Sequence, residues 1–123
     1  MKTTASNKMI AAFMGWEKEK ALYHIPKDAG YFATPYHTNL YFHCSWDWIM
    51  PVVEKIEKLD ETDDHLSRFE ICSHYAAFWL FDENRNIIAG AYKTSPEKVK
   101  FATKIEAVYY VAVEAIKWYN KKK

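Results

Sequence analysis

The chain has 123 residues, 50% of them hydrophobic and 17% aromatic, which is enough for one domain spanning residues 1–123 with a sizeable core. Seventeen basic and sixteen acidic side chains leave a formal charge of +1, so no overall field attracts duplex nucleic acid or an anionic membrane. The longest mainly apolar run, 75–81, is far short of the roughly 20 residues that cross a bilayer, so we expect no membrane partner.

The N-terminal residues do not follow the pattern of a secretory signal, because Asn7 and Lys8 interrupt the apolar positions early. We therefore expect an intracellular protein. In a reducing compartment the two cysteines, Cys44 and Cys72, are expected to be free and buried rather than bridged.

A short amphipathic helix is predicted over residues 6–14. Ser6 is a suitable N-cap, several apolar side chains share one side, and Gly15 suits the position just after the helix. Over residues 16–38 the periodicity weakens, charges crowd together, and proline and glycine interrupt the chain. This segment predicts loop with a short strand or two.

Residues 36–43 alternate between two faces, which predicts a half-buried strand. One face of this strand would carry four polar or amphipathic side chains, namely His37, Asn39, Tyr41 and His43. Two interpretations stay open for this row: a solvated outer face, or a ligand-binding strip of neutral donors and acceptors.

A second helix follows, with Ser45 as its candidate N-cap. Its apolar residues are spaced for a single buried stripe, formed by Ile49, Val52, Val53, Ile56 and Leu59. Pro51 lies several residues into the pattern. Either the first turn is an irregular entry or the regular helix starts near Pro51 itself.

Residues 68–81 alternate at first and then become almost wholly apolar, which predicts one strand, or two with a bend, in the middle of a sheet. A turn over residues 82–86 leads to 87–92, an antiparallel partner strand. Gly90 in that strand indicates a bulge.

A long helix is predicted at the C-terminal end of the sequence. Ser95 and Pro96 could start it as N-cap and first helical residue, or Thr103 could cap a separate, later helix. Its apolar surface is wider than one stripe because of four further residues, Tyr110, Val111, Val113 and Trp118. One side of a sheet cannot cover this width, so the excess packs against the first helix or another subunit, and we favour a homo-oligomer.

These elements together predict the α+β class. We expect a small α/β sandwich in which an antiparallel sheet of three to five strands is packed by two main helices plus a short N-terminal helix.

Trp46, Asp47 and Trp48 stand at the start of the second helix. Asp47 in the first turn suits the helix dipole, and the two indoles could simply anchor the helix entry. Alternatively, an indole stacks on a base or ring while Asp47 accepts hydrogen bonds from the ligand. An exposed indole would favour this second interpretation.

The other chemical groups give weaker signals. The histidines and cysteines at 43, 44, 72 and 74 have zinc-ligand atoms, but adjacent His43 and Cys44 should face opposite sides of an extended segment, so we expect no metal. Three glycines are too few for a phosphate loop, and no catalytic residues or cofactor are expected. Arg68 and Arg85 could hold an anion or could be solvated surface residues.

Three strings resemble the phage ABA sandwich domain family of short phage and prophage proteins. They are "NKMIAAFMGW" (7–16), "HCSWDWIMPVVEKIE" (43–57) and "KIEAVYYVAVEAIKWYN" (104–120). The resemblance covers the three helices but not the strands between them. It implies a small α/β sandwich that is encoded by a phage or prophage and acts in the bacterial host cytoplasm. Five residues match the family motif, and no role is carried over with them: His43, Ser45, Trp46, Asp47 and Trp48.

The combined interpretation is a phage-encoded, non-enzymatic binding protein. A small anionic ligand, such as a nucleotide-type signal sequestered to counter host defence, would be bound by the aromatic, histidine and arginine positions named above. The alternative is an adaptor or inhibitor that binds a host protein through its aromatic surface.

Overall fold

The computed structural model describes residues 3–19, 22–24, 36–37, 40–59, 66–72, 75–93 and 103–122. The described elements follow one another as α1 (Thr3–Phe13), β1 (Glu17–Glu19), β2 (Leu22–His24), β3 (Tyr36–His37), α2 (Trp46–Glu57), β4 (Leu66–Ile71), β5 (Ala76–Phe81), β6 (Ile87–Lys93) and α3 (Lys104–Lys122). The described strands form two antiparallel three-stranded sheets, ordered β1-β2-β3 and β4-β5-β6.

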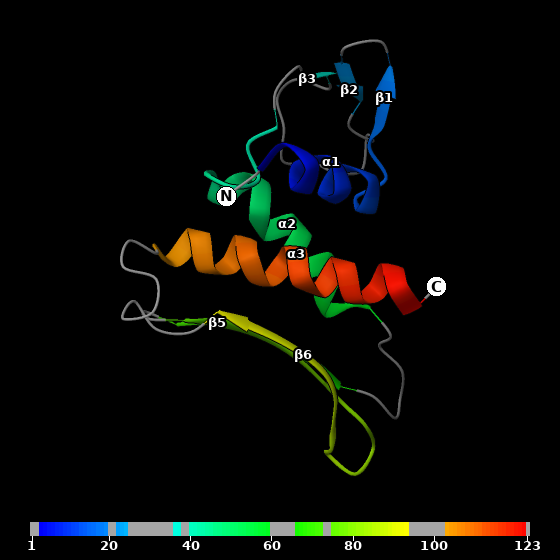
Figure 1. Cartoon of the computed structure of the whole chain (residues 1–123), viewed down its shortest axis with the longest axis vertical. Coiled ribbons are helices and arrows are strands. Elements are labelled where there is room, and N and C mark those ends of the chain that lie inside the picture. The colour runs from blue at the N-terminus through cyan, green and yellow to red at the C-terminus, as the bar shows by residue number, and fades with distance from the viewer. Residues whose placement is uncertain are drawn as a thin grey trace.

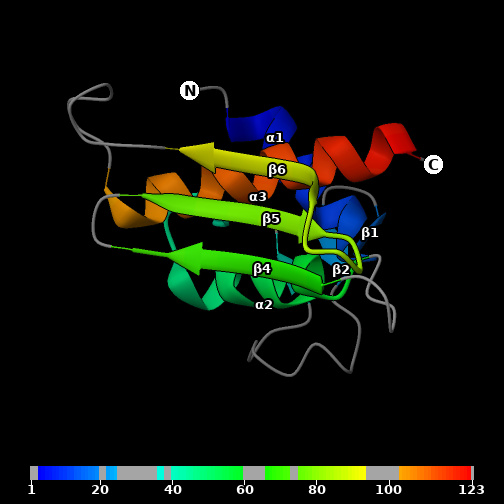
Figure 2. The same cartoon turned by 90° about the horizontal axis from the view of Figure 1, so that it is seen from below.

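The helices α2 and α3 lie side by side behind the larger sheet, with α2 against β4 and α3 against β5 and β6, and α1 lies on the side of α3 away from the sheet (Figure 1 and Figure 2). The helix α3 thus contacts β5, β6, α2 and α1. The smaller sheet lies beyond α1 in Figure 1. The predicted α+β class is confirmed, with a three-stranded antiparallel sheet packed by the two main helices.

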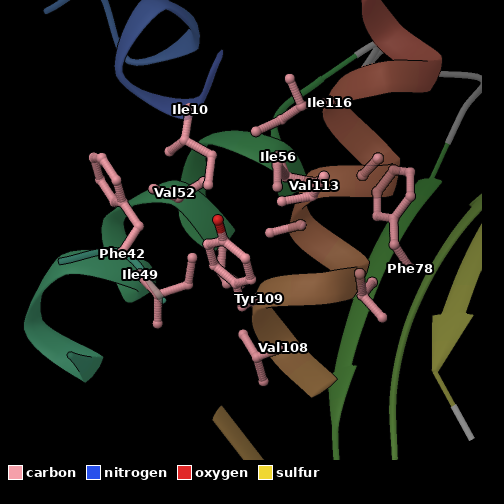
Figure 3. Packing of buried hydrophobic residues seen from close by; sticks show 14 of the residues in the cluster. Ile10, Phe42, Ile49, Val52, Ile56, Phe78, Val108, Tyr109, Val113 and Ile116 are labelled. Carbon is pink, nitrogen blue, oxygen red and sulfur yellow. The ribbon is translucent and has the colours of Figure 1, made fainter. Parts of the chain in front are cut away.

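The broad apolar surface of α3 is explained by this central position. Val108, Val111 and Val113 are all buried. Figure 3 shows Phe78 packed near α3 from the sheet, and Ile10 and Ile56 approaching from the other helices. Much of the excess apolar width is therefore covered within the chain, as one of the two alternatives predicted, while Tyr110 and Trp118 are half-buried. The width of α3 no longer requires another subunit, so the homo-oligomer must be argued from a different surface.

The start of α3 agrees with the second of the two predicted positions. Thr103 Oγ1 accepts a hydrogen bond from the Glu106 backbone N–H at 3.3 Å, and Glu106 Oε2 accepts one from the Thr103 N–H at 3.4 Å. This reciprocal pair is a capping box, which satisfies two backbone donors at the helix end. Ser95 and Pro96 lie outside the described residues.

Replacing Thr103 by alanine removes this cap and should lower the free energy of unfolding by about 1 kcal/mol. Thr103→Ser keeps the hydroxyl and should retain most of the stability. Chemical denaturation of both variants measures the difference. Equal stability of the alanine and serine variants would show that the hydroxyl does not cap α3.

The first helix begins earlier than predicted, at Thr3, so Ser6 lies within it. Its end is as expected, because Gly15 takes a positive φ of 79°, a conformation that glycine adopts without steric cost. Lys55 of α2 donates a hydrogen bond to the Phe13 carbonyl and lies 4.8 Å from the centre of the Phe13 ring. A cation at this carbonyl end also complements the dipole of α1.

All five residues of the predicted stripe are buried, four of them in the second helix and Leu59 in the turn just after its end. Ser45 is the N-cap with extended backbone (φ −132°), although its side chain makes no capping hydrogen bond. The helix is regular from Trp46 onward and contains Pro51, so neither expectation about an irregular or late start was right. Proline is tolerated here because the helical hydrogen bond that it removes would join the Asp47 carbonyl in the first turn, close to the helix end.

The segment 68–81 contributes to two strands, β4 and β5, which was one of the two predicted alternatives. The next strand, β6, pairs with β5. The bulge is not at Gly90. The register shifts opposite Leu80 and Phe81, where Ile88 has no partner. Glycine is required at position 90 for a different reason. A Cβ atom there would lie 2.7 Å from the Trp79 ring, which occupies the space next to the Gly90 backbone.

Candidate functional site

Three aromatic rings anchor the entry to α2. Trp48 lies edge-to-face with Trp16 and Phe42, at centroid distances of 5.4 and 5.2 Å, and Trp16 and Phe42 are 5.0 Å apart. All three side chains are buried. Trp48 is therefore a core residue, and its predicted ligand-binding role loses its geometric basis.

The predicted strand 36–43 is wrong at residues 40–43. Residues 42–44 form a turn, and the backbone N–H groups of Cys44 and Ser45 donate to the Tyr41 carbonyl at 3.2 and 3.0 Å. The alternating pattern gave a wrong prediction because Phe42 is buried by its tertiary contacts with Trp16 and Trp48, and not because it lies on the inner face of a strand.

The four side chains predicted to share a strand face therefore do not form one row. His37 belongs to β3, and Asn39 lies outside the described residues. Tyr41 is exposed, whereas His43 is half-buried and hydrogen-bonded to Asn7. A continuous polar strip leading to the tryptophans is excluded by this turn.

The exposed part of the helix entry is a small rim formed by Tyr41, Trp46 and Asp47. Tyr41 is 43% exposed and Trp46 is 40% exposed. Asp47 is also exposed and lies in the first turn of α2. The two tryptophans thus divide between the two predicted roles: Trp48 anchors the helix, and Trp46 presents its indole outward.

His43, between Tyr41 and Trp46 in the sequence, belongs to a polar network that joins three parts of the chain. Asn7 of α1 is 4% exposed. Its side-chain Oδ1 accepts a hydrogen bond from the Tyr109 hydroxyl at 2.9 Å, and its Nδ2 lies 3.0 Å from His43 Nδ1. Burial raises the pKa of the Tyr109 hydroxyl, while a hydrogen bond with the Ser6 side chain opposes the shift. The network therefore favours a neutral tyrosine.

This shift predicts a loss of stability in alkali. Tyrosine in the unfolded chain ionises near its ordinary pKa of 10.0, before the buried Tyr109 does. The contribution of Tyr109 is thus fully present below about pH 10 and is lost as the pH rises further. The stability difference between wild type and Tyr109→Phe should shrink as the pH rises above about 10, as measured by denaturation. A constant difference would contradict the prediction.

A second candidate site is the outer face of the larger sheet, which we define as the face of β4–β6 turned away from α2 and α3. In Figure 2 the three strands lie in front of the helices, and no described helix crosses this face. Phe78 and Leu80 point inward and belong to the core, whereas Trp79 and Phe81 alternate with them and point outward.

Apolar side chains cover one end of the outer face. Ile87 lies opposite Phe81 in the ladder and is 59% exposed, and Ile88, at the bulge, is 49% exposed. Trp79 lies opposite Gly90 with its ring over the glycine backbone. Four large apolar side chains thus gather where β5 and β6 turn into each other.

The part of the outer face formed by β4 carries polar side chains. Arg68 lies opposite Trp79 and forms an ion pair with Glu70, with Nε 3.2 Å from Oε1. Tyr75 donates a hydrogen bond to Glu70 Oε2 at 3.3 Å. The Cys72 thiol and then the Glu70 carboxylate raise the pKa of the Tyr75 hydroxyl. The charge of Arg68 is therefore balanced on its own strand.

Arg85 does not join Arg68. It lies in the turn between β5 and β6 with a positive φ of 65°, and its N–H donates to the Asp82 carbonyl at 3.0 Å. The Asp82 carboxylate organises the same turn by accepting hydrogen bonds from the Asn84 and Asn86 backbone N–H groups, each at 2.9 Å. The two arginines are thus separate surface residues and do not make one anion site.

The cysteines are free, as predicted, but they are not buried: Cys44 is exposed and Cys72 is half-buried. Within the described part of the chain, no three His, Cys, Asp or Glu side chains gather in a way that could hold a metal ion. His74, one of the residues considered for zinc, lies outside that part.

Sequence reasoning missed Asn7, Tyr109, Trp79 and Phe81. Asn7 could have been found, because it lies three and four positions before the buried Ile10 and Ala11 and so shares their helix face. Trp79 and Phe81 could not be assigned to a face, because the run 76–81 is apolar on both sides.

No helix in the described ranges is both long and apolar enough to cross a membrane. Comparison with known proteins adds no relative: no family model, no curated protein and no solved structure matches this chain.

Proposed function

We propose that this chain is a non-enzymatic binding protein that docks a partner protein on the outer face of β4–β6. The observation that carries the proposal is the group of outward apolar side chains, Trp79, Phe81, Ile87 and Ile88, on a face that no described helix covers. Contiguous apolar surface of this kind marks protein contacts in soluble proteins. The resemblance to phage proteins makes a bacterial host protein the expected partner, met in the host cytoplasm.

The chemistry of the outer face supports a protein rather than a charged small molecule as the partner. The four apolar side chains carry no charge themselves, and the nearby Arg68 is already paired with Glu70. The charged residues Asp82, Glu83 and Arg85 lie in the adjacent turn, where they can stay in water while the four apolar side chains lose theirs on docking. Tryptophan and arginine are also the residues that most often dominate the binding energy of protein interfaces.

The test is a double variant, Ile87→Asp with Ile88→Asp, compared with Trp46→Ala as a matched change on a distant exposed surface. A host protein captured by the wild-type chain is purified, and its affinity for the three proteins is measured by calorimetry. The double variant should bind at least tenfold more weakly, because losing a central interface residue costs more than about 1.4 kcal/mol. Equal affinities of the double variant and the wild type would refute the docking face.

The exposed Trp46 favours a second candidate function, the binding of a small nucleotide-type ligand. Its indole offers a face for stacking beside the Asp47 carboxylate, which can accept hydrogen bonds from a base or sugar. In thermal melting against cyclic and linear nucleotides, a ligand at 100-fold over its Kd should add about 2.7 kcal/mol, and Trp46→Ala should abolish the shift. A melting temperature unchanged by every nucleotide would leave protein docking as the function.

The same outer face is where a homo-oligomer would form, since α3 is already largely covered by the chain. Sedimentation equilibrium of the wild type and of the Ile87→Asp, Ile88→Asp variant separates the two cases. A wild-type dimer that the variant converts to monomer assigns the face to a second copy, and a wild-type monomer leaves it to a different protein.

A further inference from the structure

Both polar atoms of the Asn7 side chain have hydrogen-bond partners inside the molecule. Nδ2 donates to the Leu40 carbonyl at 3.2 Å and lies 3.0 Å from His43 Nδ1, while Oδ1 accepts from the Tyr109 hydroxyl at 2.9 Å. The three partners come from the segment before α2 and from α3. A single buried amide therefore joins α1 to both.

The Leu40 carbonyl fixes the orientation of this amide. A carbonyl oxygen only accepts hydrogen bonds, so the atom of Asn7 facing it must be the NH₂ group. That group then presents its second N–H to His43 Nδ1, which must accept with a lone pair. The neutral imidazole consequently carries its one proton on Nε2.

We infer that Asn7 and His43 form a proton-sensitive latch that holds the segment 40–45 against α1. A proton taken from solvent by Nδ1 would replace the accepting lone pair with an N–H directed at another N–H. Turning the amide over would restore an acceptor for the imidazolium but would direct Oδ1 at the Leu40 carbonyl. Each orientation loses one buried hydrogen bond, so the closed latch requires a neutral ring.

The surroundings of His43 offer no compensation for a positive charge. From α3 the ring meets Tyr109, edge-to-face at a centroid distance of 6.1 Å, and from α1 it meets Asn7. On its own segment, the Cys44 thiol is directed to the Tyr41 carbonyl at 3.8 Å. Asp47 of α2 is exposed, and within the described ranges no carboxylate forms an ion pair with His43.

His43 lies in the sequence between Tyr41 and Trp46, two of the residues that form the rim. The segment that the latch holds also carries the Tyr41 carbonyl, which accepts the hydrogen bonds of the turn before α2. Histidine changes its charge between about pH 5 and pH 8, so mild acid would open the latch and loosen both the rim and α1. This inference is independent of the docking face proposed above.

The first test is the tautomer of His43 in the intact wild-type protein, read from the two ring ¹⁵N chemical shifts at pH 7.5. The latch predicts a protonated Nε2 and an unprotonated Nδ1. A proton on Nδ1 would overturn the inference, because that nitrogen could not then accept from Asn7. This measurement needs no variant and so does not depend on whether a substituted chain folds.

The second test compares wild type with His43→Gln, whose side-chain oxygen can still accept from Asn7 but does not titrate. Between pH 7.5 and 5.5 the wild-type melting temperature should fall by about 4 °C more than that of the variant. Amide hydrogen exchange in α1, corrected for its intrinsic pH dependence, should accelerate over the same range in the wild type alone. Identical pH dependence of wild type and His43→Gln would overturn the latch.

Discussion

Trp48→Ala should lower the free energy of unfolding by about 3–5 kcal/mol, whereas Trp46→Ala, two residues away, should lower it by less than about 1 kcal/mol. The two substitutions remove the same side chain from the same turn of α2. They differ because Trp48 is 8% exposed among Trp16 and Phe42, while Trp46 is 40% exposed.

Urea denaturation of the two variants, monitored by far-ultraviolet circular dichroism, checks this prediction. Circular dichroism is preferred because each variant keeps only four of the five tryptophans, so its fluorescence differs from that of the wild type even without a change in stability. Comparable losses for both variants would mean that Trp46 also packs in solution. That result would remove the exposed indole on which the second candidate function depends.

A comparable contrast is expected on β5. Phe78→Ala should cost about 3–5 kcal/mol, because Phe78 is 1% exposed and lies within the core beside Phe69 and Trp118. Phe81→Ala should cost about 1 kcal/mol, because Phe81 is half-buried on the outer face.

Equilibrium denaturation of the two phenylalanine variants also tests the proposed function, since that proposal requires β5 to present Phe81 outward. A larger loss for Phe81→Ala than for Phe78→Ala would reverse the two faces of the sheet. In that event the docking surface would have to be sought elsewhere.

Periodicity predicted the helices well where one face is buried and the other is wet. The stripe of α2 was correct at its four helical positions because a regular helix repeats its contact with the core every three to four residues, and Leu59 is buried just past the helix end. The alternation over 36–43 failed because it is a local pattern, and the burial of Phe42 is decided by Trp16, which is distant in the sequence. A two-residue period cannot distinguish a strand from a turn that buries one ring.

The candidate sites were less predictable than the fold. The sequence pattern indicated a cluster of Trp46, Asp47 and Trp48. Which of these side chains is exposed depends on how α2 packs against the rest of the molecule. The outer face could not be inferred, because Phe78 and Trp79 are equally apolar and only the position of α3 separates them. The hydrogen bonds of Asn7 could not be predicted, because they depend on α1, the segment before α2 and α3 meeting in the folded chain.

The central place of α3 has a consequence for synthesis on the ribosome. The helix α3 is translated after the other described elements, and it supplies a surface against which the larger sheet and the first two helices pack. Until residues 104–122 leave the exit tunnel, Phe78 and Ile10 have no common partner, so the earlier segments cannot complete their tertiary structure one after another. Folding of the nascent polypeptide is therefore expected to wait for the synthesis of α3, with a chaperone-accessible interval until that helix has emerged.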